Sequence, residues 1–159
     1  MKKENEIVES LKGFLKENLI KVTIQRERRI FAHIKSDALR DSISYLVRKL
    51  DVKHLSTITA IDLDGEIELI YHLTYKGSTT ISIRITLSKK DLKASTITDL
   101  IPGAVLYERE VHDLFGIEFE GHPDLSRLML PEEWPEDVYP MRKEYGIEQL
   151  REMVSKKQS

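Results

Sequence analysis

The stretch that decides the fold of this chain is EREVHDLFGIEFEGHPDL, residues 108–125. Its first half continues a helical pattern that begins near Ala104, and Gly116 predicts the C-terminal end of that helix. The stretch is also dense in ionisable groups: Glu108, Arg109, Glu110, His112, Asp113, Glu118, Glu120, His122 and Asp124. Such a run is compatible with a catalytic site, a metal site or a surface that holds another protein. On a helical wheel, the charged residues before Gly116 take the polar side of the helix.

Upstream of this helix, the sequence predicts the order α-β-β-α-β-β-β. Apolar residues at helical spacing indicate a helix over residues 4–18, and Ser36 or Asp37 can cap a second helix. Alternating patterns indicate strands over residues 20–25, 30–34, 55–63, 66–76 and 79–87. Asp64-Gly65 is a strong hairpin turn signal. Because two helices can cover one face of a mixed sheet, these elements predict a two-layer α+β domain over residues 1–120.

Downstream of the helix, residues 121–159 predict an extended docking arm with a C-terminal tail. Residues 121–140 contain four of the chain's five prolines, so regular structure cannot run far there. The same segment is rich in large apolar side chains, which a disordered tail would lack. These are Leu125, Leu128, Met129, Leu130, Trp134, Val138 and Tyr139. An irregular, proline-rich arm must bury them against its own sheet or against a partner, and composition alone leaves both possibilities open.

Composition restricts the classes of function. The 159 residues include no cysteine, which excludes disulfides, cysteine-ligated iron–sulfur clusters and thiolate zinc sites. The formal net charge of −2 argues against a general nucleic-acid binder. Residues 108–145 hold 11 acidic and 4 basic side chains, so the acidity is concentrated there. No apolar run approaches the roughly 18–20 residues that span a bilayer. Glutamates at positions 4, 6 and 9 interrupt any signal peptide, which predicts a cytoplasmic protein.

Three self-contained functions remain alternatives. His112 and His122 lie near several carboxylates and could ligate zinc or iron in a metal-dependent enzyme, although no His-Glu-x-x-His motif is present. An acid–base enzyme has abundant carboxylates available, but the chain has no nucleophile elbow and no Gly-rich phosphate loop. An RNA-binding α+β module would use Tyr71, His72 and Tyr75, although no basic-aromatic RNA-binding signature accompanies them.

Docking of a partner protein is the fourth interpretation. Apolar anchors in the arm alternate with arginines, and aromatic and Arg residues are enriched in interface hot spots. The anchors are Leu125, Leu128, Leu130, Trp134 and Tyr139, and the arginines are Arg127 and Arg142. The acidic excess around them favours a basic partner surface.

The stretch and its continuation resemble the signature of a known family. The matching residues are EREVHDLFGI (108–117), GHPDL (121–125) with Arg127, and PMRKEY (140–145). They look like the thirty-kilodalton subunit family of respiratory complex I, a part of NADH dehydrogenase. The same family supplies a component of membrane-bound energy-converting NiFe hydrogenases, formate hydrogenlyases and related archaeal complexes. His112 and Ser126 depart from the usual complex I pattern, and residues 130–135 look more like hydrogenase-type and archaeal members. Scarce Asn and Gln beside abundant Lys and Glu favour a thermophilic source.

The resemblance implies a non-catalytic, cofactor-free subunit of the peripheral electron-transfer arm of a membrane-bound, ion-translocating oxidoreductase complex. Such a subunit would lie on the cytoplasmic, inner face of the cell membrane. It would dock a partner like the large subunit of NiFe hydrogenase, near a small iron–sulfur subunit, and would bind neither metal nor nucleic acid. The expected docking residues are Glu108, Arg109, Glu110, Asp113, Phe115, Gly116, His122, Pro123, Asp124, Leu125, Arg127, Trp134, Pro140, Arg142 and Tyr145.

Overall fold

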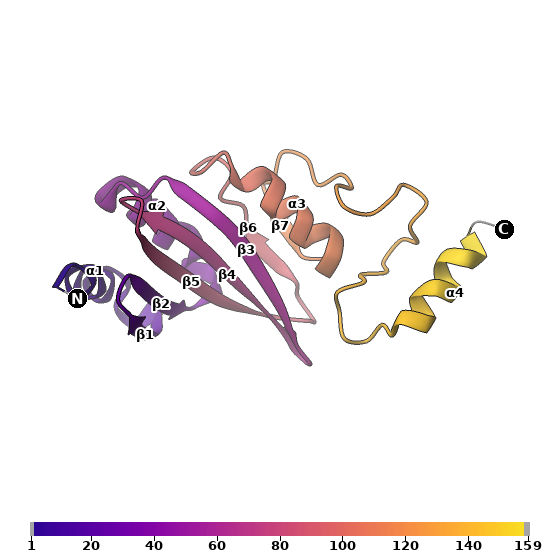
Figure 1. Ribbon diagram of the computed structural model, residues 1–159, viewed down its shortest axis with the longest axis horizontal. Coiled ribbons are helices and arrows are strands. Elements are labelled where there is room, and N and C mark those ends of the chain that lie inside the picture. Colours follow the sequence, from indigo (N-terminus) through magenta and orange to yellow (C-terminus); the bar gives the residue numbers. More distant parts are fainter. Residues whose placement is uncertain (1, 158–159) are drawn as a thin grey trace.

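The computed structural model describes residues 2–157, which form an α+β domain followed by an irregular segment and a helix (Figure 1). The first half contains α1 (Lys2–Leu15), β1 (Leu19–Arg26), β2 (Arg29–Ile34), α2 (Leu39–Leu50) and β3 (His54–Leu63). The second half contains β4 (Glu66–Tyr75), β5 (Thr79–Ser88), β6 (Lys93–Ser95), α3 (Ala104–Phe115), β7 (Glu118–Glu120) and α4 (Ile147–Lys157). The predicted order α-β-β-α-β-β-β followed by a third helix is confirmed.

The main sheet is mixed, as predicted. Its strand order is β1-β2-β5-β4-β3. Strands β2 and β5 run parallel in the middle, with Ile30 opposite Ile81 and Ala32 opposite Ile83. The other neighbouring strands are antiparallel. The parallel pair is possible because α2 and the β3–β4 hairpin separate β2 from β5 along the chain.

One face of this sheet forms the core. Alternate residues of the central strands are fully buried there, as the period of two in a half-covered sheet requires. They include Ile30, Ala32, Ile34, Ile67, Leu69, Tyr71, Leu73, Ile81, Ile83 and Ile85. These side chains share one apolar cluster with residues of α1, α2 and α3, so the three helices pack on this face. Each fully buried Ile or Leu contributes about 1.5–3 kcal/mol.

The sequence correctly predicted the hairpin turn between β3 and β4, but not the start of α2. The Asp64-Gly65 hairpin is present, with Asp64 in the left-handed region at φ +58°. The expected caps of the second helix are wrong, because neither Ser36 nor Asp37 makes a side-chain cap hydrogen bond to it. Both residues instead belong to a short 3₁₀ turn that precedes α2. Since this turn continues directly into α2, the helix needs no separate side-chain cap at its start.

Three elements carry no clear sequence signal: β6, β7 and α4. A parallel pair of three-residue strands, β6 and β7, joins the segment before α3 to the segment after it. The tail contains α4, where the sequence predicted only an extended segment. Between β7 and α4, residues 121–146 have no helix or strand, in line with their prolines. None of the helices within residues 2–157 is both long enough and apolar enough to cross a membrane.

Candidate functional site: the C-terminal arm on helix α3

The C-terminal end of α3 is shaped to receive the arm, residues 121–159. Gly116 ends the helix in the left-handed conformation at φ 72°, and its N–H donates to the His112 carbonyl at 2.8 Å, as predicted. A Cβ atom at Gly116 would lie 2.5 Å from the Tyr139 ring and 2.6 Å from Arg142 Nη2. Glycine is therefore required here twice, once for the backbone conformation and once for the approach of the arm.

Asp113 holds the middle of the arm. Its carboxylate Oδ2 accepts hydrogen bonds from three consecutive backbone N–H groups, those of Leu128 at 3.2 Å, Met129 at 2.8 Å and Leu130 at 2.8 Å. The Asp113 side chain is almost fully buried, although the helical wheel placed it on the polar side of the helix. Hydrogen bonds to a charged group are about twice as strong as neutral ones, so this carboxylate is a strong point of attachment.

Arg109 holds the start of the arm one turn earlier on the helix. Its guanidinium donates to the Ser126 carbonyl at 3.1 Å, to Ser126 Oγ at 3.0 Å and to the Arg127 carbonyl at 3.0 Å. The Asp124 carboxylate in turn accepts from the Ser126 N–H and hydroxyl. These hydrogen bonds of Ser126 lower the pKa of Asp124. The guanidinium of Arg109 thus binds the backbone of the arm instead of forming an ion pair with a neighbouring carboxylate.

Glu108 and His122 form the buried end of the site. The Glu108 carboxylate is fully buried and accepts from the Thr96 hydroxyl and, at 2.9 Å, from the Ile97 N–H, which corrects its assignment to the polar side of the helix. His122 Nε2–H donates to the Val105 carbonyl at 3.1 Å, while its Nδ1 accepts from the Asp124 N–H at 3.0 Å. His122 Nε2 lies 3.9 Å from Glu108 Oε2. Because Val105 and Asp124 occupy both nitrogens of His122, these two hydrogen bonds fix the orientation of the imidazole ring.

The charge of Glu108 makes stability depend on pH. Burial raises its pKa from 4.5 to about 7, against the hydrogen bonds of Thr96 and Ile97, which lower it. Between about pH 4.5 and pH 7, Glu108 therefore binds a proton in the folded chain that it releases on unfolding. As the pH rises through this window, the free energy of unfolding decreases.

Glu108→Gln is expected to remove this pH dependence, because the amide is neutral throughout and still offers an acceptor to Ile97. The free energy of unfolding of the unmodified chain should fall by up to about 3 kcal/mol more than that of the variant across the window. Urea unfolding at several pH values measures it, with Glu110→Gln on the same helix as the control. Parallel pH profiles for the variant and the unmodified chain would contradict the assignment.

The end of the arm is fastened to the C-terminus of α3 and to β3. Arg142 Nε–H donates to the Phe115 carbonyl at 2.7 Å, and its guanidinium lies 4.4 Å from the centre of the Tyr139 ring. The Lys143 N–H donates at 2.9 Å to Asp62 Oδ2, a buried carboxylate on the core face of β3 that also pairs with Lys89. A cation at a helix C-terminus is favourable because it meets the negative end of the helix dipole.

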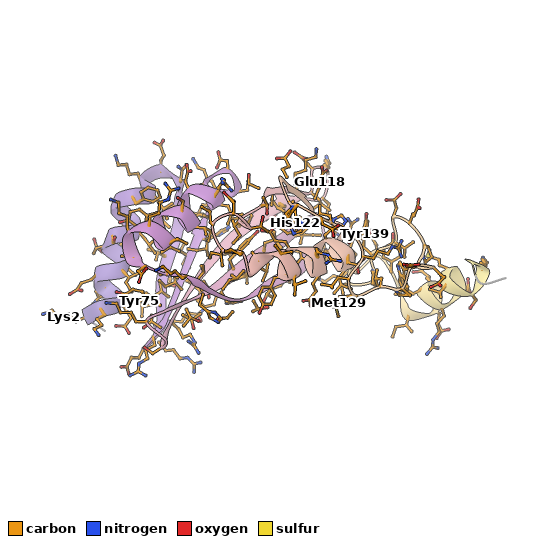
Figure 2. All side chains as sticks on the ribbon, turned by 90° about the horizontal axis from the view of Figure 1, so that it is seen from above. Lys2, Tyr75, Glu118, His122, Met129 and Tyr139 are labelled. Carbon is orange, nitrogen blue, oxygen red and sulfur yellow. The ribbon has the colours of Figure 1, made fainter. Side chains whose placement is uncertain are left out.

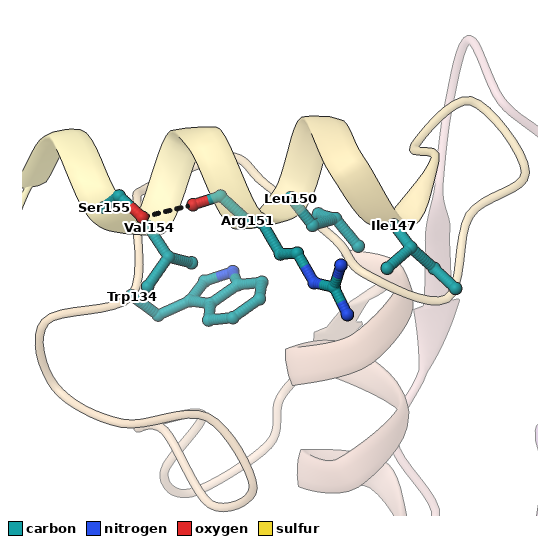
Figure 3. Close-up of a pocket in the computed structure, with 6 residues that line it drawn as sticks. All are labelled: Trp134, Ile147, Leu150, Arg151, Val154 and Ser155. Carbon is teal, nitrogen blue, oxygen red and sulfur yellow. Dashed lines mark hydrogen bonds between the residues drawn. The ribbon is translucent and has the colours of Figure 1, made fainter.

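The arm exposes three large apolar side chains among its charged ones. Leu128 is 38% exposed, Met129 57% and Met141 56%. The Trp134 indole N–H donates to the Val138 carbonyl at 2.8 Å, which closes a tight loop. Helix α4 lies above this indole, and together they line a groove of about 350 Å³ (Figure 3). The groove residues are Trp134, Ile147, Leu150, Arg151, Val154 and Ser155.

Hydrogen bonds bring several of the predicted residues together where α3 meets the arm, the region in which Figure 2 labels His122, Met129 and Tyr139. Leu125 packs against the core, and Tyr145 Oη–H donates to the Asp137 carbonyl at 3.2 Å. Arg127 donates to the Pro131 carbonyl at 2.9 Å. Glu110 is partly exposed on α3, Pro123 is exposed at the start of the arm, and Pro140 is partly exposed near its end. The sequence analysis did not single out Thr96, Ser126 or Asp62 as site residues. Only Asp62 could have been found, because it is an acidic residue at a strand position that faces the core.

The histidines proposed for a metal site make hydrogen bonds within the chain, and the tyrosine proposed for RNA stacking is buried. His112 Nδ1–H donates to the Ile117 carbonyl at 2.8 Å, and both nitrogens of His122 bond to the chain. Within residues 2–157, no group of three or more His, Cys, Asp or Glu side chains is arranged to hold a metal ion. Tyr71 lies in the core with no exposed surface, so it offers no stacking platform for RNA.

Fold and site together define a class: a two-layer α+β domain whose arm is fastened to its third helix by charged side chains. The family model described as "Respiratory-chain NADH dehydrogenase, 30 Kd subunit" matches residues 32–151. The chain therefore belongs to the complex I 30 kDa subunit family, as the resemblance implied.

Curated relatives share about half of this chain. It is 42% identical over 83 residues to the C/D subunit of NADH-quinone oxidoreductase from Yersinia pestis (strain Pestoides F), an alignment that covers 52% of this chain and 14% of that protein. It is 44% identical over 82 residues to the protein of the same name in Psychrobacter sp. (strain PRwf-1), covering 51% and 13%. The aligned region thus spans only about a seventh of the length of these relatives.

Solved structures match over more of the chain. A chain from the structure of the membrane-bound sulfane sulfur reductase (MBS), an archaeal respiratory membrane complex, is 29% identical and superposes with a TM-score of 0.76. The match covers 91% of this chain and 86% of that one. A trypsin-resistant fragment of Nqo5 superposes with a TM-score of 0.64 at 23% identity, over 76% of this chain and 98% of the fragment, and so supports the fold alone.

Proposed function

We propose that this chain is a non-catalytic structural subunit in the peripheral electron-transfer arm of a membrane-bound, ion-translocating respiratory complex. Residues 1–120 form its body, and residues 121–159 dock a partner that resembles the large subunit of NiFe hydrogenase. The complex places the chain on the inner face of the cell membrane, near a small iron–sulfur subunit. Its contribution is geometric, because electron transfer needs the redox subunits to be held in a fixed register.

One observation carries this proposal: the arm is fastened to α3 by hydrogen bonds while large apolar side chains of the arm stay exposed. Asp113, Arg109 and Arg142 bond to backbone atoms of the arm or the helix end, so they fix the shape of the arm before any partner binds. Preorganisation of this kind lowers the entropic cost of association. Leu128 and Met129 remain at the surface, together with the apolar face of α4. Exposed apolar patches with a polar rim are typical of protein interaction sites.

The comparisons support the choice of partner. The names of the curated relatives combine the letters C and D, which suggests that a D-type subunit is the neighbour of this chain. The match to a chain of an archaeal respiratory membrane complex favours an archaeal assembly of this kind over an NADH-driven one. Residues 130–135 also look more like the archaeal and hydrogenase-type members of the family than like the complex I members.

The test combines Met129→Glu with Met141→Glu. Placing two charges in the proposed interface should prevent docking, because a buried unpaired charge costs several kcal/mol. Both side chains are more than half exposed, so the isolated chain should fold normally. The control is Ile20→Glu, an equally exposed apolar residue at 57%, on β1 at the opposite end of the molecule (Figure 1).

The expected result is loss of co-purification with the large subunit for the double variant and normal co-purification for the control. Circular dichroism and thermal unfolding of each isolated chain establish that the fold is unchanged. If the double variant assembled as well as the unmodified chain, the outer side of the arm would not be the docking surface.

A further inference from the structure

The second face of the main sheet is not covered by any helix of the described chain. It carries the alternate residues of the five strands, and they line a groove of about 580 Å³. Every strand contributes: Gln25 and Arg26 from β1, Arg29 and Phe31 from β2, Thr80 and Ser82 from β5, His72 from β4, and Ser56 and Thr57 from β3. A smaller hollow beside it shares Gln25 and Phe31 and adds Lys21, Thr23, His33 and Arg84. The two neighbouring hollows thus give this face of the sheet a recessed surface of mixed polar and apolar character.

This surface carries cations without carboxylate partners. Among residues 2–157, Lys21, Arg26 and Arg29 have no acidic side chain within ion-pair distance. Arg29 is instead oriented by the Thr80 hydroxyl and by the Arg28 carbonyl at 3.3 Å. By contrast, Arg84 on the same face pairs with Glu68 at 3.4 Å. The open face therefore has an excess of positive charge, although the whole chain has a net charge of −2.

The centre of the surface is rigid and neutral. His72 bonds through Nδ1 to the Ser82 hydroxyl at 2.9 Å and through Nε2 to the Thr59 hydroxyl at 3.2 Å. Burial, and then the charge of Arg29, lower the pKa of His72, so the imidazole adds no charge. Phe31 meets the His72 ring edge-on at 6.4 Å. Preformed hydroxyl and guanidinium donors around a half-apolar floor suit an extended segment that carries carboxylates.

We propose that this face docks an acidic polypeptide segment of a neighbouring protein in the complex, with its Asp or Glu side chains on Lys21, Arg26 and Arg29. This second contact rests on the proposed function only in placing the chain within a complex, and it lies on a different surface from the arm. An RNA strand fits less well. Within residues 2–157, Phe31 is the only Phe, Tyr or Trp side chain that lines the two hollows, and it is partly buried.

The experiment is zero-length carbodiimide cross-linking of the native assembled complex, followed by mass spectrometry. The reagent joins an amine to a carboxylate in direct contact. We expect Lys21, and the lysine introduced by Arg26→Lys, to couple to Asp or Glu of one partner segment. Lys12 is the internal control: it lies 2.8 Å from Glu9 on α1 and should couple only within the chain. Adding Lys21→Gln should abolish the first cross-link and leave the Lys12 product unchanged.

Two results would overturn the inference. One is an intact complex in which Lys12 couples to Glu9 while Lys21 and the introduced lysine give no product with another protein. The other is coupling of these lysines to a second copy of this chain. A failure of the proposed function is distinguishable, because the chain would then not be recovered in the complex at all.

Discussion

Replacing Asp113 with Ala is expected to release the arm from α3. The side chain accepts three backbone N–H groups in a nearly water-free position, and the substitution leaves all three without their charged acceptor. A hydrogen bond to a charged group contributes about 1.5–3 kcal/mol, so the loss of three should weaken the docking of the arm by about 4.5–9 kcal/mol. The core of the sheet lies elsewhere and should persist.

Hydrogen exchange of the isolated chain measures this directly. The amides of residues 128–130 should lose protection in Asp113→Ala, while those of β4 and β5 keep theirs. Glu110→Ala is a matched control, because this carboxylate lies on the same helix and is partly exposed to solvent. Asp113→Asn should give an intermediate result, since its amide oxygen still accepts but carries no charge. Unchanged protection at residues 128–130 would show that another contact holds the arm.

Gly116→Ala is expected to produce the second large effect. The left-handed backbone alone costs a non-glycine residue about 1–2 kcal/mol. The added methyl group would also overlap the Tyr139 ring and the Arg142 guanidinium, which adds about 1–3 kcal/mol of steric strain or displaces the arm.

Gly77→Ala separates the two causes. Gly77 has nearly the same conformation, at φ +70°, but nothing lies within 4 Å of a Cβ atom there. The difference between the two variants in free energy of unfolding therefore reports the contact between α3 and the arm. Equal losses in both would mean that only the backbone conformation matters and that Tyr139 does not pack on the helix end in solution.

The site shows where sequence reasoning reaches its limit. Gly116 was predictable as a helix end, because a left-handed cap depends only on local conformation. The burial of Asp113 and Glu108 was not predictable from the helical wheel. Most of their partners are backbone amides, those of residues 128–130 and of Ile97, and the sequence does not show which backbone amides a carboxylate will meet.

The fold shows the same division. The hairpin at Asp64-Gly65 and the alternation in β3, β4 and β5 are local properties, and they indicated the right elements. The central parallel pairing of β2 with β5 brings together segments about fifty residues apart, and no turn signal encodes it. Helix α4 was missed because it packs mainly over Trp134 and has little core of its own.

These features give the chain two surfaces of different chemistry. The arm and α4 present apolar groups on a frame fixed by Arg109, Asp113 and Arg142. The open face of the sheet presents unpaired cations. A protein with two such surfaces on a rigid body can hold neighbours in a fixed mutual position, which is the role that we propose for it.

Methionine oxidation reports whether a neighbouring protein covers the arm. Met129 and Met141 are both more than half exposed in the chain, so dilute hydrogen peroxide should oxidise them readily when the chain is alone. In the purified native complex we expect both to become strongly protected, because a neighbouring protein covers this part of the arm. Oxidation of both residues at the same rate in the complex as in the isolated chain would contradict this expectation.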